Sequence, residues 1–243
     1  MIEIWRPQIH GTGESQRAYD DIYGHEGIQL LDSFYLWLLG LVNLRPGGRL
    51  LDVSCGQGKL VGFARQAGIE AYGLDFSKAA IHRAHAITGR ACFTVGDGMR
   101  LPFPNRSFDC ITCIGSLEHF SDPLSGMREI WRMLAVNGLA SILLPNTFSL
   151  LGNVNYARKH GDAFDDGQPI QRYNTRVGWT RMLEQSGLRV RQVAKYEITR
   201  PRTRADWAWY LRRPRKVAHL LAGLAIPVNL ANCHVFLCTR AET

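Results

Sequence analysis

Three short apolar runs in the first half of the chain each end in an aspartate. The runs lead to Asp52, Asp75 and Asp97. In open α/β sheets the ligand lies outside the carboxyl ends of parallel strands, so these runs would bring three carboxylates to one edge of a sheet. Carboxylates there can accept hydrogen bonds from the hydroxyl groups of a ligand. Single acids of this kind also cap helices, but three in register are not explained by capping alone.

A glycine-containing turn follows the first of these runs. Residues 50–60 read Leu-Leu-Asp-Val-Ser-Cys-Gly-Gln-Gly-Lys-Leu, an apolar strand followed by a turn and a helical pattern. Gly56 and Gly58 can take positive φ and carry no Cβ, so a ligand can approach the bare backbone. Such a turn alone also serves strand–helix packing. Asp75, however, lies 23 residues after Asp52, where a nucleotide ribose finds its hydroxyl acceptor.

In these features the chain resembles the class I S-adenosylmethionine-dependent methyltransferases of the small single-domain type. Residues 52–58 are similar to the family's acid-x-Gly-x-Gly-x-Gly motif, and residues 101–111 and 116–120 to its "LPF-x-x-x-SFD" and "hydrophobic-Glu-His" segments. The match covers roughly residues 45–145. The resemblance implies S-adenosylmethionine as cofactor and the following binding residues: Asp52, Ser54, Cys55, Gly56, Gly58, Asp75, Phe76, Asp97, Gly98, Met99 and Ile114.

The motif departs from the family at one position. Ser54 stands where the family has its first glycine. The serine Cβ narrows the approach to the methionine moiety and could reduce affinity, although its hydroxyl could contact the cofactor. A nicotinamide dehydrogenase would show Gly-x-Gly-x-x-Gly, and no glycine here fits that register.

His119 is the candidate general base, with Glu118 in a supporting role. It follows the fourth predicted strand, and an unperturbed histidine pKa near 6.5 suits proton removal. The alternative is that the pair only begins a helix and fixes the loop. In some quinone-ring O-methyltransferases of similar sequence, this Glu-His pair and a further acid hold a divalent metal. That position is Gly115 here, so a metal is not expected.

The periodicity of the rest of the chain predicts the elements that position these residues. Residues 15–44 carry a helical pattern broken near residues 24–27. Strands are predicted at 49–53, 69–74, 92–95, 108–114, 138–144, 188–197 and 233–239, and helices at 58–67, 77–88, 123–135 and 175–186. The alternation indicates an α/β fold. We expect a Rossmann-like, seven-stranded, mostly parallel sheet with an antiparallel last strand, helices on both faces and an N-terminal helical cap.

The whole chain of 243 residues is interpreted as one methyltransferase domain. It comprises an N-terminal cap (1–44), a cofactor-binding core (45–145) and acceptor-side insertions (146–175 and 200–231). The six cysteines lie mostly in apolar runs and are expected to be reduced thiols. The N-terminus has no apolar signal region, which favours a cytoplasmic protein.

The two insertions should determine the methyl acceptor. The first contains Tyr156, His160, Arg172 and Tyr173, and His160 is a second candidate base unless it is a solvated surface residue. The second has seven basic residues and one acid between Arg200 and Lys216 and continues into an apolar stretch. Three interpretations stay open for it: a helical flap beside the acceptor pocket, peripheral contact with an anionic membrane through residues 200–227, and RNA phosphate binding.

The sequence therefore predicts a methyltransferase acting on a small-molecule or lipid- or saccharide-linked acceptor, at oxygen. One alternative is an RNA methyltransferase that uses residues 200–216, which is disfavoured because no RNA-binding motif accompanies them. The other is a non-catalytic cofactor-binding partner subunit, for which the Ser54 departure is the argument.

Overall fold

The computed structural model describes residues 1–6, 12–25, 27–88 and 92–241, without the side chains of Thr12 and Cys92. Its main feature is a seven-stranded sheet in the order β4-β3-β2-β5-β6-β9-β8. The strands are β2 (Arg49–Val53), β3 (Glu70–Asp75), β4 (Cys92–Val95), β5 (Phe108–Ile114), β6 (Leu134–Pro145), β8 (Leu188–Tyr196) and β9 (Cys233–Arg240). All neighbours pair in parallel except β9, which is antiparallel to both β6 and β8. The predicted sheet and its antiparallel last strand are confirmed.

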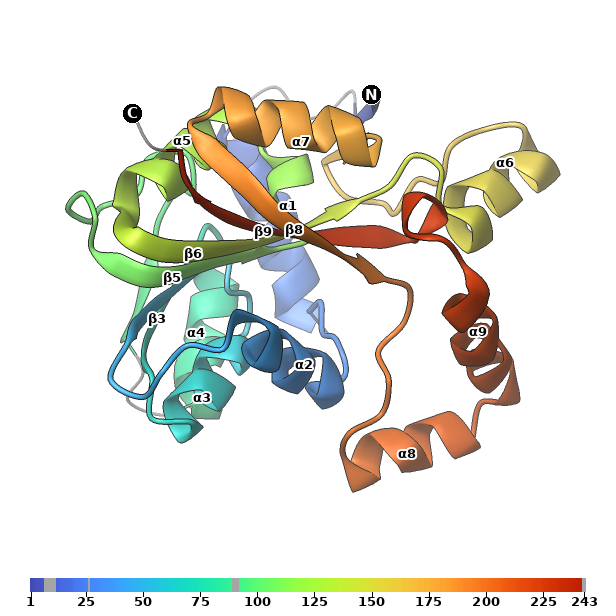
Figure 1. The fold of residues 1–243 in the computed structure, drawn as a ribbon, viewed down its shortest axis with the longest axis horizontal. Helices are drawn as coiled ribbons and strands as arrows, with labels where there is room; N and C mark the ends of the chain where they lie inside the picture. The colour runs from blue at the N-terminus through green and yellow to red at the C-terminus, as the bar shows by residue number, and fades with distance from the viewer. Residues whose placement is uncertain (7–11, 26, 89–91, 242–243) are drawn as a thin grey trace.

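Helices cover both faces of this sheet because its central strands are apolar on both sides. On one face lie α2 (Asp32–Val42), α3 (Lys59–Gln66) and α4 (Lys78–Thr88), and on the other α5 (Pro123–Met133) and α7 (Arg176–Gln185) (Figure 1). Each face has its own hydrophobic core: Phe34, Leu38 and Leu60 pack on the first, and Ile130 and Trp179 on the second. Three-layer packing of this kind fixes the strand ends that carry the site.

The predicted N-terminal helical region forms two helices, α1 (Thr12–His25) and α2. α1 is joined to the start of α4 by polar contacts. Asp20 accepts hydrogen bonds from the Ser77 hydroxyl (2.6 Å) and the Ala79 amide (3.1 Å), and the Gln16 side-chain amide donates to the Phe76 carbonyl (2.8 Å). These bonds hold α1 against the loop that follows β3.

A second, two-stranded sheet was not predicted. β1 (Ile2–Trp5) pairs antiparallel with β7 (Ile170–Tyr173). β1 lies in the segment assigned to the N-terminal helical cap, and β7 lies in the first acceptor-side insertion. Between β6 and β7 the chain forms a short π-helical turn (Leu150–Val154) and α6 (Asn155–His160). The first insertion is therefore largely ordered structure that ends in a strand.

The second insertion forms a pair of helices between β8 and β9. α8 (Arg204–Leu211) and α9 (Pro214–Ala225) project from one side of the molecule (Figure 1), and the short helix Val228–Leu230 leads back to β9. A last short helix, Leu117–His119, follows β5. Within the described ranges, no helix is long and apolar enough to cross a membrane.

Candidate active site

A cavity of about 410 Å³ lies at the carboxyl ends of β2, β3 and β5. This volume falls within the range of about 300–1,000 Å³ typical of ligand pockets. Its lining includes ten of the eleven predicted cofactor-binding residues: Asp52, Ser54, Cys55, Gly56, Asp75, Phe76, Asp97, Gly98, Met99 and Ile114. The structure thus brings residues from four separate segments to one site.

Two of the three aspartates in the wall are almost fully buried. Asp52 accepts a hydrogen bond from the Thr112 hydroxyl (2.6 Å), and burial raises its pKa to about 7, with the charge of Asp75 adding to the effect. Asp75 accepts hydrogen bonds from the amides of Gly56 (2.7 Å) and Ser77 (2.8 Å), and burial raises its pKa to about 6. A carboxylate has about four lone-pair sites, so Asp75 retains acceptor capacity toward the cavity.

The electrostatics of the cavity favour a cationic ligand. Asp52, Asp75 and Asp97 line it, and among the described residues no lysine or arginine does. Burying carboxylates without a cationic partner is costly, as their raised pKa values show. A positively charged, hydroxyl-bearing ligand would relieve this cost, whereas a dinucleotide pyrophosphate would add to it.

The turn after β2 has a left-handed backbone at the position where the sequence departs from the family. Ser54 has φ 58° and Gly56 has φ 52°. A Cβ on Gly56 would come within 2.8 Å of the Tyr23 hydroxyl, so that position also needs glycine for space. Gly58, the remaining predicted residue, does not line the cavity; it precedes α3 and lies against the Phe93 ring.

The segment after β4 forms a second part of the wall. Asp97 accepts a hydrogen bond from the Met99 amide (2.8 Å), which closes a tight turn. A Cβ on Gly98 would lie 2.5 Å from the Phe120 ring. The absence of a side chain at Gly98 therefore lets the Phe120 ring pack against the backbone of this turn.

His119 also lines the cavity, and its hydrogen bonding defines its tautomer. Its Nδ1 lies 2.5 Å from the carbonyl oxygen of Ile170, which can only accept, so Nδ1 carries the proton. Nε2 is then an unprotonated acceptor. Burial lowers the pKa of His119, which keeps the ring neutral near pH 7. The side chain is a free base held in a fixed orientation.

Glu118 does not line the cavity. Its carboxyl is buried, its Oε1 lies 3.9 Å from His119 Nε2, and its Oε2 has no hydrogen-bond partner among the described residues. Burial raises the pKa of Glu118 to about 8, so it is mostly protonated at neutral pH. The distance to His119 is too long for a hydrogen bond.

Arg172 holds the loop that carries this pair. Its buried guanidinium donates to the carbonyl oxygens of Glu118 (3.2 Å), Phe120 and Ser121 (3.3 Å), pairs with the Glu3 carboxylate, and lies 5.4 Å from the Trp5 ring centroid. The sequence suggested Arg172 as an acceptor contact. It does not line the cavity and is a clamp between the small sheet and the loop after β5.

Much of the opposite wall of the cavity was not predicted from the sequence. Trp5, Gln168 and Ile170 line the cavity, and all three come from or adjoin the unpredicted β1–β7 sheet. They carry no motif that could have identified them. Tyr19 and Tyr23 lie in the predicted N-terminal helical pattern and were not named as site residues. Both line the cavity, and the Tyr19 hydroxyl donates to the Gln168 side chain (3.0 Å).

The two predicted acceptor-side insertions contribute unequally to the lining of the main cavity. From residues 146–175, only Gln168 and Ile170 reach the main cavity, and no described residue of 200–231 does. Tyr156, His160 and Tyr173 instead line a second cavity of about 330 Å³ beside α6. His160 is therefore not placed to act as a base in the main cavity. Within the described residues, no cluster of three or more His, Cys, Asp or Glu side chains could hold a metal ion.

A family model and two curated relatives that match this chain are all named as methyltransferases. Residues 51–142 match the family model described as "Methyltransferase domain". The chain is 27% identical over 205 residues to the 27-O-demethylrifamycin SV methyltransferase of Amycolatopsis mediterranei, covering 69% of this chain and 75% of that protein. It is 32% identical over 101 residues to a demethylmenaquinone methyltransferase of Deinococcus radiodurans, covering 39% and 42%. The alignment thus spans less than half of the second relative.

Solved structures share the fold at low identity. An S-adenosylmethionine-dependent methyltransferase from Mesorhizobium loti aligns with a TM-score of 0.63 at 17% identity, over 86% of this chain and 98% of that one. The [4+2]-cyclase SpnF aligns with a TM-score of 0.67 at 20% identity, over 99% of both chains. At these identities the likeness establishes the fold alone.

Proposed function

Because this chain belongs to the class I S-adenosylmethionine-dependent methyltransferases, we propose that it transfers a methyl group to a hydroxyl oxygen of a neutral small-molecule or lipid- or saccharide-linked acceptor. The observation that carries the proposal is the cavity itself. It combines three aspartates, no described lysine or arginine, and a neutral histidine whose Nε2 is unprotonated.

The residues present fit the cofactor. S-adenosylmethionine supplies an electrophilic methyl group on a sulfonium. Asp75 would accept hydrogen bonds from its ribose hydroxyls, the 97–99 turn would lie along its adenine, and the 54–56 turn would hold its methionine moiety. The positive charge of the cofactor would stabilise the ionised forms of Asp52 and Asp75, whose pKa values burial raises. We assign Asp52, Asp75 and Asp97 to cofactor binding.

His119 would remove the acceptor's proton. Its Nδ1–H bond to Ile170 fixes the ring, and its lowered pKa keeps Nε2 unprotonated near pH 7. A positioned base of this kind typically contributes about 10²–10⁴-fold to the rate. Arg172 holds the loop of His119 through its backbone carbonyls, and Trp5, Tyr19 and Phe120 supply aromatic walls to the same cavity.

The same charge distribution bears on the acceptor. An acidic cavity repels phosphate and carboxylate groups, so a neutral hydroxyl compound fits better than an RNA phosphate backbone. Two relatives support oxygen as the methylated atom, since one is named for a 27-O-demethyl substrate and another is named as an O-methyltransferase. RNA methylation and a non-catalytic, cofactor-binding role are the alternatives. A lipid-linked acceptor would place the enzyme in the cytoplasm at a membrane surface, with peripheral contact through residues 200–227.

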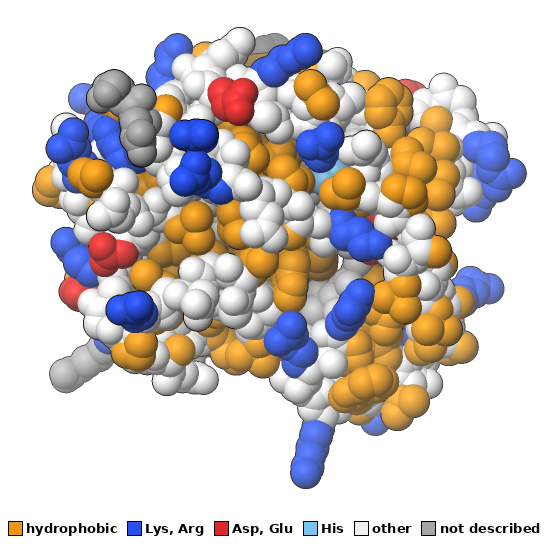
Figure 2. Space-filling model, in the orientation of Figure 1, with side chains coloured by type: hydrophobic (Ala, Val, Ile, Leu, Met, Phe, Trp, Pro, Cys, Tyr) orange, Lys and Arg blue, Asp and Glu red, His pale blue; other side chains and the backbone are white. Residues whose placement is uncertain are grey.

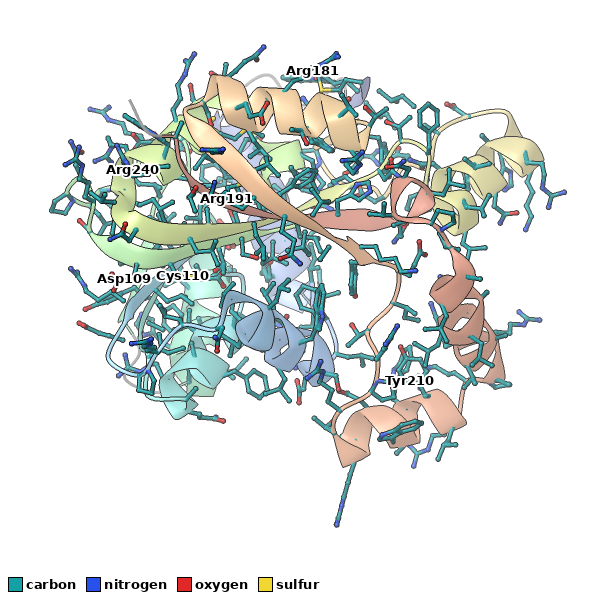
Figure 3. The ribbon with its side chains drawn as sticks, viewed as in Figure 1. Asp109, Cys110, Arg181, Arg191, Tyr210 and Arg240 are labelled. Atoms are coloured by element: carbon teal, nitrogen blue, oxygen red, sulfur yellow. The ribbon has the colours of Figure 1, made fainter. Side chains whose placement is uncertain are left out.

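Calorimetric titration with S-adenosylmethionine tests the proposal first. We expect the wild-type chain to bind it, and Asp75→Asn to raise the Kd at least about tenfold, since a hydrogen bond to a charged group contributes about 1.5–3 kcal/mol. Asp109→Asn is the control, because Asp109 accepts from the Arg49 amide (2.8 Å) at the start of β5, away from the cavity (Figure 3).

The acceptor is then sought by a labelled-methyl assay on lipid, saccharide and RNA fractions of a cell extract. Label in a lipid or saccharide fraction would support the proposal. Failure to bind the cofactor at millimolar concentration would refute it, and label confined to RNA would favour the first alternative.

A further inference from the structure

The α8–α9 helix pair exposes a set of large apolar side chains that no other described part of the protein covers. Trp207 and Leu211 on α8 are 55% and 77% exposed, and Leu221 and Leu224 on α9 are 62% and 53% exposed. Within each helix the two residues are three or four positions apart and so lie on one face. Figure 2 shows hydrophobic side chains gathered over α8 and α9 with lysine and arginine side chains around them.

The helix pair is held in place by polar contacts at its ends, which leaves these apolar faces free. Asp206 of α8 accepts hydrogen bonds from the amide (2.8 Å) and hydroxyl of Ser33, and Tyr210 donates to the Thr199 carbonyl (Figure 3). Lys195 of β8 donates to the last carbonyls of α9, those of Gly223 (3.0 Å), Leu224 (3.1 Å) and Ile226 (2.7 Å). The exposed leucines are not needed for this anchoring.

The exposed charge around these apolar residues has one sign, since the side chain of Glu197, which pairs with His219 of α9 at 3.6 Å, is buried. Seven arginines and lysines lie between Arg200 and Lys216, and the single acid there, Asp206, is buried against Ser33. From Val217 to Asn229 there is no lysine, arginine or acidic residue. A second copy of this surface would bring like charges together, which is unfavourable. An anionic surface with an apolar interior offers both complementary charge and a place for the exposed side chains.

We propose that the α8–α9 pair docks on the surface of an anionic lipid bilayer. Trp207, Leu211, Leu221 and Leu224 enter the headgroup–acyl boundary, and the surrounding arginines contact the lipid headgroups. In addition, Ser33 belongs to the 28–35 segment, from which Ile28, Leu30 and Tyr35 line the main cavity. Docking therefore holds one wall of the cavity near the bilayer. This last step rests on the proposed function and assigns the acceptor to membrane lipids or lipid-linked compounds.

Vesicle binding tests docking independently of methyl transfer. The full-length chain, without cofactor or acceptor, is sedimented with two kinds of vesicle. One consists of phosphatidylcholine alone, and the other also contains roughly 30% phosphatidylglycerol, an anionic lipid. We expect binding only to the anionic vesicles. Arg212→Gln/Arg215→Gln should weaken it about fivefold for each residue changed, and Leu211→Ser/Leu221→Ser at least about tenfold.

Matched substitutions on other surfaces serve as controls. Arg181→Gln/Arg191→Gln removes two exposed arginines from α7 and β8 (Figure 3), and Val136→Ser/Val177→Ser removes two exposed apolar residues. Both should bind vesicles as the wild type does, and far-ultraviolet circular dichroism should show that all variants are folded.

The proposal is overturned by any of four results: no binding to anionic vesicles, equal losses in the control variants, preferential binding of RNA that displaces the vesicles, or a dimer that the leucine variants abolish. A chain that docks but transfers no methyl group would contradict the proposed function alone. A chain that transfers methyl groups but does not dock would contradict this inference alone.

Discussion

Ser54 adopts a backbone conformation that serine rarely takes. Its φ of 58° lies in the left-handed region, where a non-glycine residue carries a steric cost of about 1–2 kcal/mol. This explains why a glycine occupies the same position in the family motif. The turn is kept by its surroundings, since the next residues bond to β3: the Cys55 amide donates to the Leu74 carbonyl (2.9 Å) and the Gly56 amide to Asp75 (2.7 Å).

Substitutions at Ser54 should separate this backbone cost from side-chain effects. Ser54→Gly should change the free energy of unfolding by less than about 1 kcal/mol, because relief of the left-handed strain is offset by the greater freedom of glycine in the unfolded chain. Ser54→Val should destabilise by about 1–3 kcal/mol, since a β-branched residue fits this region poorly. Urea unfolding followed by circular dichroism measures both. Equal stability of the glycine and valine variants would contradict the left-handed assignment.

The role of His119 can be read from a pH profile. Because burial lowers its pKa below 6.5, kcat at saturating cofactor should stay flat from pH 8 to below pH 6.5 and fall only at lower pH. His119→Gln should lower kcat about 10²–10⁴-fold, remove that acid limb and leave the cofactor Kd unchanged. Unchanged turnover would exclude His119 as the base. Glu118→Gln is a matched control, since Glu118 is already mostly protonated at pH 7 and the variant should retain near wild-type turnover there.

Among the elements, the small β1–β7 sheet contributes to the site in two ways. It supplies Trp5 and Ile170 to the cavity and places Arg172 beneath the loop that carries His119. A buried arginine that donates to three backbone carbonyls leaves all three without a partner when it is removed. The sheet is thus both a wall and a support.

Arg172→Met should destabilise the protein by about 2–4 kcal/mol and lower kcat more than it raises the cofactor Kd, because the His119 loop loses its support. Arg6→Met is the comparison. Arg6 pairs with Asp165 at 3.0 Å and donates to the carbonyls of Gly167 (3.1 Å) and Gln168 (3.2 Å), but its side chain is about 40% exposed. Water can replace these bonds, so its loss should cost about 1 kcal/mol. Chemical unfolding and steady-state kinetics on both variants give the values. Similar losses in the two would argue against the clamp.

The parts of the fold that follow from local pattern could be predicted from the sequence. β2 and β3 are apolar runs with an acid at or near their ends, and Gly187 follows α7 as a helix stop. β1 and β7 could not be predicted, because each has four residues and they pair across most of the chain. Short strands gain their stability from a distant partner, which a local pattern does not reveal.

The candidate site also has one side that local sequence motifs predict and one side that they do not. The side expected to bind the cofactor is encoded in contiguous motifs, and ten of the eleven residues named there line the cavity. Gly58 does not, because its role is to start α3. The opposite wall is assembled from Trp5, Tyr19 and Gln168, which lie far apart in the sequence and share no spacing. The role of Arg172 was also missed, since its partners are backbone carbonyls that any sequence would supply.

For the whole molecule, the buried carboxylates make stability depend on pH. The pKa of Asp52 is raised to about 7 in the folded protein from an ordinary value near 3.8, so the folded state holds a proton that the unfolded chain has already lost. Its favourable contribution is present below pH 4 and is lost as pH rises through 7. The cofactor-free protein should therefore become less stable between pH 5 and pH 7.5, by on the order of 2–4 kcal/mol for this residue.

Asp52→Asn should remove this residue's share of the dependence while keeping the Thr112 hydrogen bond. Asp75 and Glu118, whose pKa values burial also raises, should keep their shares. Urea midpoints measured at several pH values, with and without S-adenosylmethionine, provide the test. The cofactor should restore wild-type stability most strongly above pH 7, where Asp52 and Asp75 are charged. Asp109→Asn, which removes an exposed carboxylate, should keep the wild-type profile. A wild-type protein whose stability rises between pH 5 and pH 7.5 would contradict the burial argument.

The position of the α8–α9 pair between two adjacent strands makes it an exchangeable module. The chain leaves the sheet at Tyr196 and returns at Cys233, two residues that face each other in the β8–β9 ladder. Next to this pair, the Asn232 amide donates to the Glu197 carboxylate (2.7 Å), which joins the two ends of the inserted segment. A segment of another length could be inserted there without shifting the strand register, and each doubling of loop length costs only about 0.6 kcal/mol. Evolution could therefore change where this enzyme works without altering the strands that hold its cofactor.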